Sequence, residues 1–494
     1  MAVDYDVVII GGSTAGRYAA VAATKLRATV ALVEPPNRQV ATSARSPLLA
    51  QLTPHALTHL GRLTQQLNDA EQFGIHSSYA GAAQNPSNSV LWAEAMQWAE
   101  NVVSNLEDQN SPAVLASLGV DFIVGSGQFE KQLHLAFRVN GRLLRSRTYL
   151  IASNSRPVIP DIDGLQTTGY LTVPEVWQPL TSQKPPTRWV ILGGDPSGIQ
   201  LAQTLTRLGL HVTLIVKRSH ILAKEDPEVA HLVQTSLEAE GVRVLTKTLV
   251  TQVKLIQDKK WVYAGDEAIE TDEILLSAGQ QPDIEALNLK AVGVKWNRRR
   301  LQLNEKLQTT NPRIYACGDV IGGYQFVNIA NYEARIALKN ALFFPVFKVD
   351  YRSIPWAVFS EPQLARVGLT EVQARSRYTH EVLVLRQYFK SVAAAQLSGE
   401  TTGICKLILL RNGKILGASL VGPQAGELIN VIALAISQRL KIDAIATLAP
   451  VYPSLSEILE QLAVVWTNAS LTQNSRLQNF LESFFNFRRS WEIK

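Results

Sequence analysis

The chain of 494 residues is 46% hydrophobic, which predicts a globular protein with several buried cores and excludes a fibrous or disordered chain. Its net charge of +6 and isoelectric point near 9.1 are mildly basic. Because the basic residues are scattered, this charge favours an acidic partner or an anionic surface and does not indicate nucleic acid.

The N-terminus leads directly into the strand pattern DYDVVIIGG, without the charged, apolar and small-residue succession of a signal peptide. The apolar stretch around residues 428–450 is interrupted by Gln438, Arg439, Lys441 and Asp443, so no run reaches the ~18–20 residues needed to cross a bilayer. We therefore expect a cytoplasmic protein, or one attached to a membrane surface from outside.

Cys317 and Cys405 are the only cysteines, with 87 other residues between them. This number and spacing exclude a disulfide framework and a thiolate metal site, and no metal is expected.

Residues 5–16, YDVVIIGGSTAG, read as a buried strand that runs into a glycine-rich turn and a helix. The next strand, TVALVE, ends in Glu34, about 20 residues on, where a dinucleotide-binding fold places its ribose-binding acid. In this pattern the first glycine permits the tight turn, the last lets helix and strand approach, and the helix N-terminus faces a pyrophosphate. The predicted contacts are Gly11, Gly12, Ser13 and Gly16, with Ser13 at the usual middle-glycine position.

The same arrangement returns at residues 188–216, where RWVILGGDPSG precedes a helix and the strand HVTLIV. Gly193 and Gly198 take the glycine positions, but Asp195 brings a carboxylate where a backbone must approach a pyrophosphate. Lys217 and Arg218 follow the second strand and match a 2′-phosphate, which favours NADP(H). The alternative is that this part keeps the fold and binds no nucleotide.

The order of these motifs resembles the pyridine nucleotide-disulfide oxidoreductases, the flavoprotein family of glutathione reductase, dihydrolipoamide dehydrogenase and mercuric reductase. Four further segments carry the resemblance: YLIASNSRPVIPDIDG, TTNPRIYACGDV, WAVFSEPQLARVGLTEVQA and YPSLSEILEQLA. It implies an FAD cofactor held also by Ala152, Ser153 and Asp319, with Asp319 bonded to the ribityl chain. It further implies a homodimer.

Family members pass electrons from NAD(P)H through flavin to a disulfide made by two cysteines with four residues between them. Here those positions fall on Thr42 and Pro47, or on Ser46 and Gln51, depending on where a gap is placed. Neither choice supplies a thiol, and Cys317 and Cys405 are expected to be buried small hydrophobic residues. Ser46, Gln51 and His55 are candidates to face the flavin instead.

The resemblance also implies a proton-carrying histidine, and Tyr452 stands at its position. Glu457 keeps the position of the acid that orients this histidine. A phenol with an ordinary pKa near ~10 is a poor general base at neutral pH. Tyr452 and Glu457 are thus either catalytic residues or parts of a dimer contact.

The C-terminal segment SRLQNFLESFFNFRRSWEIK places apolar residues at helical spacing. Arg488, Arg489 and Trp491 flank the resulting stripe, which consists of Leu477, Phe480, Leu481, Phe484 and Phe485. Such a helix lies in a membrane interface, packs on its own protein or dimer mate, or binds a partner.

We predict an α/β protein with two Rossmann-like dinucleotide-binding domains, for FAD and NAD(P), and an α+β C-terminal dimerisation domain. The expected boundaries are 1–155 with 277–345 for the FAD domain, 156–276 for the NAD(P)-type domain, 346–466 for the dimerisation domain and 467–494 for the tail.

The leading hypothesis is an FAD-dependent oxidoreductase in which electrons leave the flavin directly for an acceptor other than a disulfide. Lys217 and Arg218 favour NADPH as the donor, whereas Asp195 favours an acidic electron-transfer protein attracted by the basic surface. A second hypothesis is a redox sensor or a binding or regulatory protein that no longer catalyses and whose tail recruits a membrane or a partner.

Overall fold

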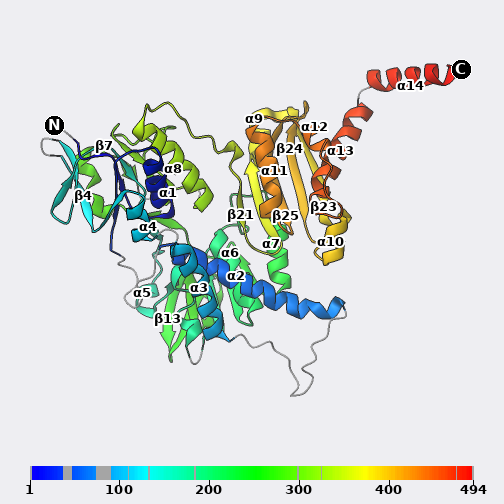
Figure 1. The fold of residues 1–494 in the computed structure, drawn as a ribbon. Coiled ribbons are helices and arrows are strands. Elements are labelled where there is room, and N and C mark those ends of the chain that lie inside the picture. The colour runs from blue at the N-terminus through cyan, green and yellow to red at the C-terminus, as the bar shows by residue number, and fades with distance from the viewer. Residues whose placement is uncertain are drawn as a thin grey trace. The chain divides into compact units, whose positions relative to one another are not determined.

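The computed structural model describes residues 3–36, 47–73, 91–108, 111–131, 134–182, 185–297, 300–323, 325–473 and 475–491 (Figure 1). The chain forms two compact units. The first unit comprises Met1–Leu222 and Leu237–Val349, and the second comprises Ala223–Ser236 and Asp350–Lys494.

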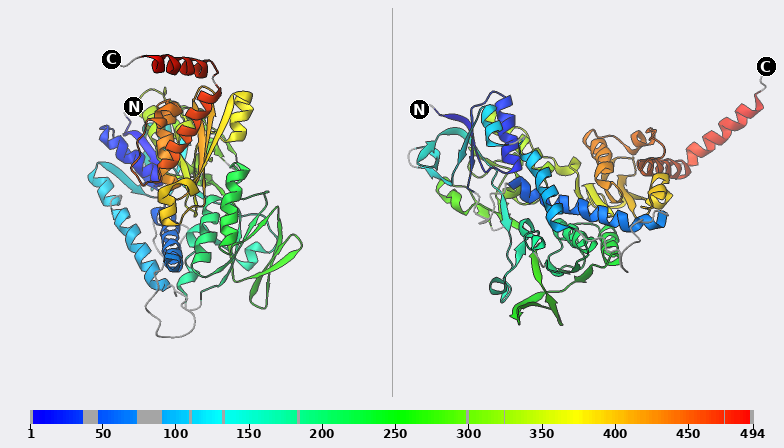
Figure 2. Two further views of the ribbon diagram at one scale, coloured as in Figure 1. Left: turned by 90° about the vertical axis from the view of Figure 1, so that its right-hand side faces the viewer. Right: turned by 60° about the horizontal axis from the view of Figure 1, so that its bottom comes forward.

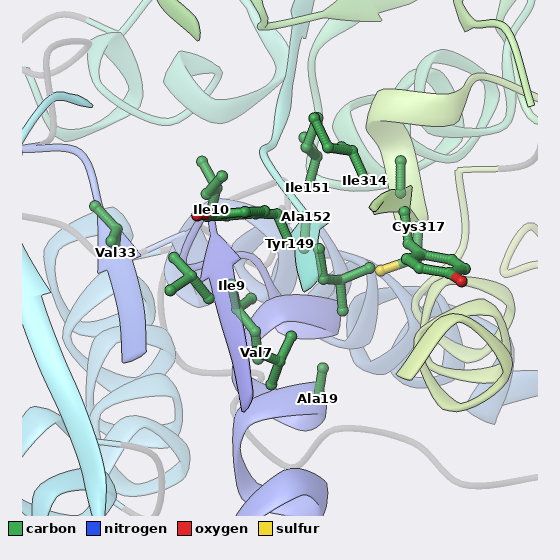
Figure 3. Close-up of a cluster of buried hydrophobic side chains, with 14 of the residues drawn as sticks. Val7, Ile9, Ile10, Ala19, Val33, Tyr149, Ile151, Ala152, Ile314 and Cys317 are labelled. Carbon is green, nitrogen blue, oxygen red and sulfur yellow. The ribbon is translucent and has the colours of Figure 1, made fainter. Parts of the chain in front are cut away.

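The first unit contains a five-stranded parallel sheet in the order β20-β7-β1-β2-β3. Its strands are β1 (Tyr5–Ile10), β2 (Val30–Glu34), β3 (Val120–Val124), β7 (Ser146–Ile151) and β20 (Ile314–Ala316). Helices α1 (Thr14–Lys25) and α8 (Val327–Leu342) pack against each other beside it. The strands read as nearly continuous apolar runs because both faces are covered, as Figure 3 shows for the side chains around β1.

A second five-stranded parallel sheet has the order β12-β11-β10-β16-β9 and repeats the first over four strands. Its fifth strand, β9, precedes β10 in the chain, whereas β20 follows β7. Its strands are β9 (Leu171–Thr172), β10 (Arg188–Leu192), β11 (His211–Val216), β12 (Arg243–Thr246) and β16 (Glu273–Leu276). Helix α6 (Pro196–Arg207) follows β10 as α1 follows β1, and α7 (Pro227–Ala239) joins β11 to β12. The expected repeat of two Rossmann-like folds is confirmed.

In each repeat, the chain forms a three-stranded antiparallel sheet just before the fourth repeated strand of the parallel sheet. These are β4 (Gly127–Lys131), β5 (Leu135–Val139) and β6 (Arg142–Leu144) in the first case, and β13 (Val250–Ile256), β14 (Lys259–Ala264) and β15 (Glu267–Thr271) in the second. The two connections between the repeats run side by side, because β8 (Ser155–Pro157) pairs with β17 (Gln280–Pro282).

The long helix α2 (Pro47–Asp69) packs against α6 of the second repeat and against α3 (Trp92–Asp108). The remaining short elements of the first unit are α4 (Pro112–Ser117), α5 (Leu165–Thr168), β18 (Trp296–Asn297), β19 (Arg300–Leu301) and the 3₁₀ turns η1 (Ala70–Phe73), η2 (Val173–Glu175), η3 (Pro179–Thr181), η4 (Glu285–Leu287), η5 (Leu289–Val292) and η6 (Gly318–Ile321).

The second unit is built on an antiparallel sheet in the order β21-β22-β25-β24-β23. Its strands are β21 (Trp356–Val358), β22 (Gln363–Gly368), β23 (Val382–Tyr388), β24 (Ile404–Leu410) and β25 (Ile415–Gly422). The helices are α9 (Glu371–Tyr378), α10 (Ala393–Ser398), α11 (Ala425–Ser437), α12 (Ile442–Ala446), α13 (Glu457–Gln473) and α14 (Ser475–Ser490), with 3₁₀ turns η7 (Tyr351–Ser353), η8 (Thr379–Glu381) and η9 (Phe389–Ser391). Together with the parallel sheets, this mixed unit confirms the predicted fold class.

None of the helices described in the structure is both long and apolar enough to span a membrane.

Candidate cofactor site and catalytic positions

The carboxyl ends of the first sheet's strands meet at one edge. The backbone N–H of Gly11 donates to strand β2 at 2.8 Å, that of Ala152 donates to β1 at 2.8 Å, and that of Cys317 donates to β7 at 3.0 Å. Figure 3 shows Ile10, Ala152 and Cys317 at this edge. Parallel α/β sheets bind ligands at such an edge, near the reversal of strand order.

Each glycine of the turn after β1 is required by a close contact. Gly11 has φ +113°, and a Cβ there would lie 2.4 Å from the carbonyl oxygen of Ala152. A Cβ on Gly12 would lie 2.2 Å from the Glu34 carboxyl carbon, and one on Gly16 would lie 2.1 Å from the Gly11 oxygen. The turn therefore brings Gly11 and Gly16 against neighbouring backbone and Gly12 against the Glu34 side chain.

Ser13 is the N-cap of helix α1. Its Oγ accepts a hydrogen bond from the backbone N–H of Gly16 at 3.2 Å. A serine at this position thus satisfies one of the free N–H groups of the helix, which a glycine would leave for solvent or a ligand.

Glu34 is held in place by Arg17, a residue that the sequence analysis did not single out. The Arg17 guanidinium lies 2.7 Å from the Glu34 carboxylate and also donates to the Gly12 carbonyl at 3.1 Å. Burial raises the pKa of Glu34, although Arg17 acts in the opposite direction. The sequence signal for Arg17 was its position four residues after Ser13, in the first turn of α1. Helical side chains point toward the helix N-terminus, so Arg17 is directed at the glycine-rich loop.

Asp319 lies in η6, directly after β20. The hydroxyl of Ser155 donates to its carboxylate at 3.1 Å, and burial raises the pKa of Asp319. The neighbouring Gly318 has φ +75°, and its N–H donates to the carboxylate of Glu333 at 2.8 Å. Glu333, on α8, is only 3% exposed and fixes the turn that presents Asp319. The sequence analysis missed Glu333, because an isolated acid in a helix gives no signal of a contact 15 residues away.

The residues at this edge fit FAD. The Ser153 side chain is 9% exposed, and its Oγ has no hydrogen-bond partner among the residues that the structure describes. A buried hydroxyl without a partner is costly unless a ligand completes it. The N-terminus of α1 suits a pyrophosphate, and the Glu34 and Asp319 carboxylates suit sugar and ribityl hydroxyls.

The second repeat reproduces the same backbone geometry. Gly193 has φ +120°, and a Cβ there would lie 2.0 Å from the Ser277 carbonyl oxygen. A Cβ on Gly198 would lie 2.7 Å from the Ser277 side chain. Lys217 and Arg218 follow the end of β11 and are exposed. The turn after β10 therefore has the close backbone approach seen after β1, and two exposed cations follow β11.

Asp195 takes the N-cap position of α6, as Ser13 does for α1, but its side chain makes no capping bond to the helix. A Cβ on Gly279 would lie 3.5 Å from the Asp195 carboxylate, so this carboxylate faces the connection that follows β16. A negative charge at the positive end of α6 competes with a pyrophosphate for that end.

Two of the four candidate positions for the family's cysteine pair lie in helix α2. Thr42 and Ser46 are outside the described residues; Pro47 and Gln51 belong to α2, but their side chains are outside the described part.

His55 contacts the second repeat. Its Nδ1 lies 3.1 Å from the Gln200 side-chain amide of α6, and partial desolvation lowers the pKa of His55. The same Gln200 amide donates to Thr58 at 2.8 Å. The polar contact of His55 is therefore with the helix that follows β10.

Cys317 and Cys405 are both fully buried, each in the hydrophobic core of a different unit. Burial raises the pKa of both thiols, and Glu333 raises that of Cys317 further. Their prediction as buried small residues is confirmed.

Tyr452 and Glu457 precede and begin helix α13. The Tyr452 side chain is 76% exposed in the single chain, which leaves it accessible to a partner or substrate. Glu457 is the first residue of α13 and accepts a hydrogen bond from the backbone N–H of Ser454 at 3.0 Å.

Comparison with known proteins agrees with this architecture. A model of the pyridine nucleotide-disulphide oxidoreductase family matches residues 5–334, and a model of that family's dimerisation domain matches residues 354–463. Mercuric reductase from Staphylococcus aureus is 30% identical over 472 residues, covering 94% of this chain and 82% of the relative. Dihydrolipoyl dehydrogenase from Bacillus subtilis is 29% identical over 464 residues, covering 92% and 96%.

Solved structures show the same fold. The Cu(II) complex of the HOCl-induced flavoprotein disulfide reductase RclA from Escherichia coli has a TM-score of 0.79 and 26% identity, covering 93% of this chain and 99% of that chain. LpdA from Mycobacterium tuberculosis has a TM-score of 0.80 at 23% identity, with the same coverage, and supports the fold alone. The chain therefore belongs to the pyridine nucleotide-disulphide oxidoreductase family of flavoproteins and carries its dimerisation domain, which supports a homodimer.

Proposed function

We propose that this protein is an FAD-dependent oxidoreductase whose flavin passes electrons directly to an acceptor that is not a disulfide. The observation that carries this proposal is the contrast between the polar edge that suits FAD and the two buried cysteines. The edge of the first sheet keeps a polar set suited to FAD, including the unpartnered Ser153 hydroxyl. The only two cysteines of the sequence are each 0% exposed and belong to different units.

In this proposal the FAD domain consists of residues 1–155 and 277–345, the NAD(P)-type domain of 156–276 and the dimerisation domain of 346–466. When bound, FAD supplies hydride and single-electron transfer. The chain positions it: the N-terminus of α1 faces the pyrophosphate, Glu34 accepts from a ribose hydroxyl, and Asp319 bonds the ribityl chain. The proposed contacts are Gly11, Gly12, Ser13, Gly16, Glu34, Ala152, Ser153 and Asp319.

The proposed activity differs from those named for two relatives, mercuric reductase and dihydrolipoyl dehydrogenase. A thiol must ionise to act as a nucleophile or a metal ligand, and burial opposes ionisation of both thiols here. Quinones, dyes, oxygen and small redox proteins accept electrons from flavin without a thiol, and these are the classes of acceptor we propose.

The donor is either NADPH or an acidic electron-transfer protein. The exposed Lys217 and Arg218 at the end of β11 support NADPH, because they offer two cations to a 2′-phosphate. The Asp195 carboxylate at the start of α6 supports the protein donor, because it opposes a pyrophosphate.

The second candidate is a sensing or binding protein without catalysis. It is favoured by Tyr452, which stands at the position of the family's histidine, and by Asp195, which brings a carboxylate to the second glycine-rich turn. It predicts a bound flavin with very slow turnover for every donor and acceptor.

The test is an anaerobic visible spectrum of the purified protein, followed after NADPH is added and then after a quinone or ferricyanide. A flavin spectrum that bleaches and recovers supports the proposal. The matched controls are Cys317→Ala and Cys405→Ala, which should turn over as the wild type does. Loss of turnover in either variant, with flavin retained, or faster reduction of disulfides or Hg²⁺ than of quinones, would overturn it.

A further inference from the structure

The C-terminal helix α14 presents a continuous stripe of large apolar side chains. Five apolar residues follow one another at intervals of three or four and so share one face: Leu477, Phe480, Phe484, Phe487 and Trp491. Four of them are exposed: Phe480 by 63%, Phe484 by 44%, Phe487 by 62% and Trp491 by 70%. The helix is the last labelled element in Figure 1 and is red in Figure 2.

The second unit does not cover this stripe. None of the described residues of α14 is buried. The aromatic rings contact one another along the helix, with centroids 6.3 Å apart for Phe480 and Phe484 and 5.6 Å apart for Phe487 and Trp491. An isolated helix of this length is marginally stable in water, so the stripe needs another surface.

The charges beside the stripe are basic. Residues 475–491 contain three arginines, Arg476, Arg488 and Arg489, and one acid, Glu482, a net charge of +2. The opposite face is polar and carries Ser475, Gln478, Glu482, Asn486 and Arg489. A helix with aromatic residues on one side, a polar opposite side and arginines at its ends has the composition of interfacial helices.

We propose that α14 binds the surface of an anionic lipid bilayer, with its aromatic stripe among the acyl chains and its arginines at the headgroups. This proposal does not rest on the proposed function. Interfacial helices bury a face of Phe, Leu and Trp side chains at the boundary between headgroups and acyl chains, and arginine reaches the headgroups with its long side chain. Pairing of two helices in a coiled coil instead favours branched aliphatic residues at the contact seam, repeated over several heptads. Helix α14 has aromatic residues and is only about two heptads long.

The position of α14 in the chain supports the same conclusion. The match to the dimerisation-domain model ends at residue 463, so α14 lies beyond the segment that this match covers. A bilayer would cover the whole stripe with no matching surface on another protein.

The test is co-sedimentation of the full-length, flavin-loaded protein with vesicles of phosphatidylcholine and phosphatidylglycerol, compared with phosphatidylcholine alone. The wild type should bind the anionic vesicles, and added salt should weaken this binding. Phe484→Ser with Phe487→Ser should lower the partition coefficient at least tenfold. Arg488→Gln with Arg489→Gln should lower it about 30-fold on anionic vesicles only. Asn479→Ala, on the exposed polar side of the helix, is the matched control and should bind as the wild type does.

Three results would overturn the proposal. They are no binding to either vesicle, binding that the double phenylalanine variant retains, and a change of oligomeric state on deletion of residues 475–494 without any change in vesicle binding. The last result would assign the stripe to a second copy of the chain. The flavin content and the melting temperature report whether each variant folds and binds flavin. A failure of the flavin proposal is therefore distinguishable from a failure of the vesicle-binding proposal.

Discussion

The Nζ atom of Lys406 lies 3.2 Å from Oδ2 of Asp226, and both side chains are only 3% exposed. The same ammonium lies 2.8 Å from Glu371 and 3.1 Å from Glu228. Nearby, Arg366 lies 2.9 Å from Glu225 in an equally buried pair. These ion pairs attach the segment Ala223–Ser236 to the antiparallel sheet of the second unit.

Replacing Lys406 with methionine should destabilise the second unit by about 3–5 kcal/mol, because it leaves the buried Asp226 carboxylate without its cation. The free energy of unfolding in urea measures this loss. Arg386→Met is the matched control: Arg386 also contacts Glu228 and Glu371, but its side chain is 36% exposed. A surface pair contributes about 0–1 kcal/mol, so equal losses in the two variants would contradict the prediction.

The pKa of Glu371 predicts sensitivity to acid. Burial acts to raise this pKa, but hydrogen bonds from Lys406 and Arg375 outweigh burial and bring it to about 2. Because the folded-state pKa lies below the ordinary value of 4.5, the contribution is complete above pH 4.5 and is lost as the pH falls toward 2. Glu371→Gln should therefore show a shallower loss of stability between pH 4.5 and 2 than the wild type. Unfolding curves over this range measure the difference, and parallel pH profiles would refute the assignment.

The sequence predicted the positions that follow from strand ends and missed those that follow from distant contacts. Gly11 was singled out because an apolar strand with a glycine-rich end brings its carboxyl end to the binding edge of a parallel sheet, whereas Asp319 was implied only by the resemblance of TTNPRIYACGDV to a family segment. Ser13 was recognised only as the residue at the usual middle-glycine position, although its N-cap role follows from the helix start. The Lys406 cluster had no sequence signal, since Lys406 and Glu228 lie 178 residues apart. Only the folded chain brings such residues together.

Asp195→Gly should improve the use of NADPH. Removing the carboxylate from the N-terminus of α6 removes repulsion of a pyrophosphate, so the NADPH concentration at half-maximal flavin reduction should fall at least about tenfold, equivalent to about 1.4 kcal/mol. Stopped-flow bleaching of the flavin under anaerobic conditions measures this change.

The control for Asp195→Gly is Lys217→Gln combined with Arg218→Gln. This variant should weaken the response to NADPH and leave that to NADH unchanged, because only NADPH carries a 2′-phosphate. If neither NADPH nor NADH bleaches the flavin of Asp195→Gly, the second repeat does not deliver hydride and the donor is a protein.

Gly12→Ala should weaken FAD binding at least about tenfold. The added Cβ would lie 2.2 Å from the Glu34 carboxyl carbon, so Glu34 must move. That movement disturbs both the 2.7 Å ion pair with Arg17 and the acceptor proposed for the ribose. A loss of one charge-assisted hydrogen bond costs about 1.5–3 kcal/mol. The flavin-to-protein ratio after dialysis, followed by titration with FAD, measures the effect.

Gly61→Ala is the matched control, in helix α2 of the same unit. A Cβ at Gly61 would lie 3.4 Å from Thr204, an ordinary van der Waals contact, and alanine is the better helix former. This variant should keep its flavin. If Gly12→Ala binds FAD as tightly as Gly61→Ala does, then Glu34 does not hold the ribose. The adenosine end of the cofactor must in that case depend on the turn backbone and the N-terminus of α1 alone.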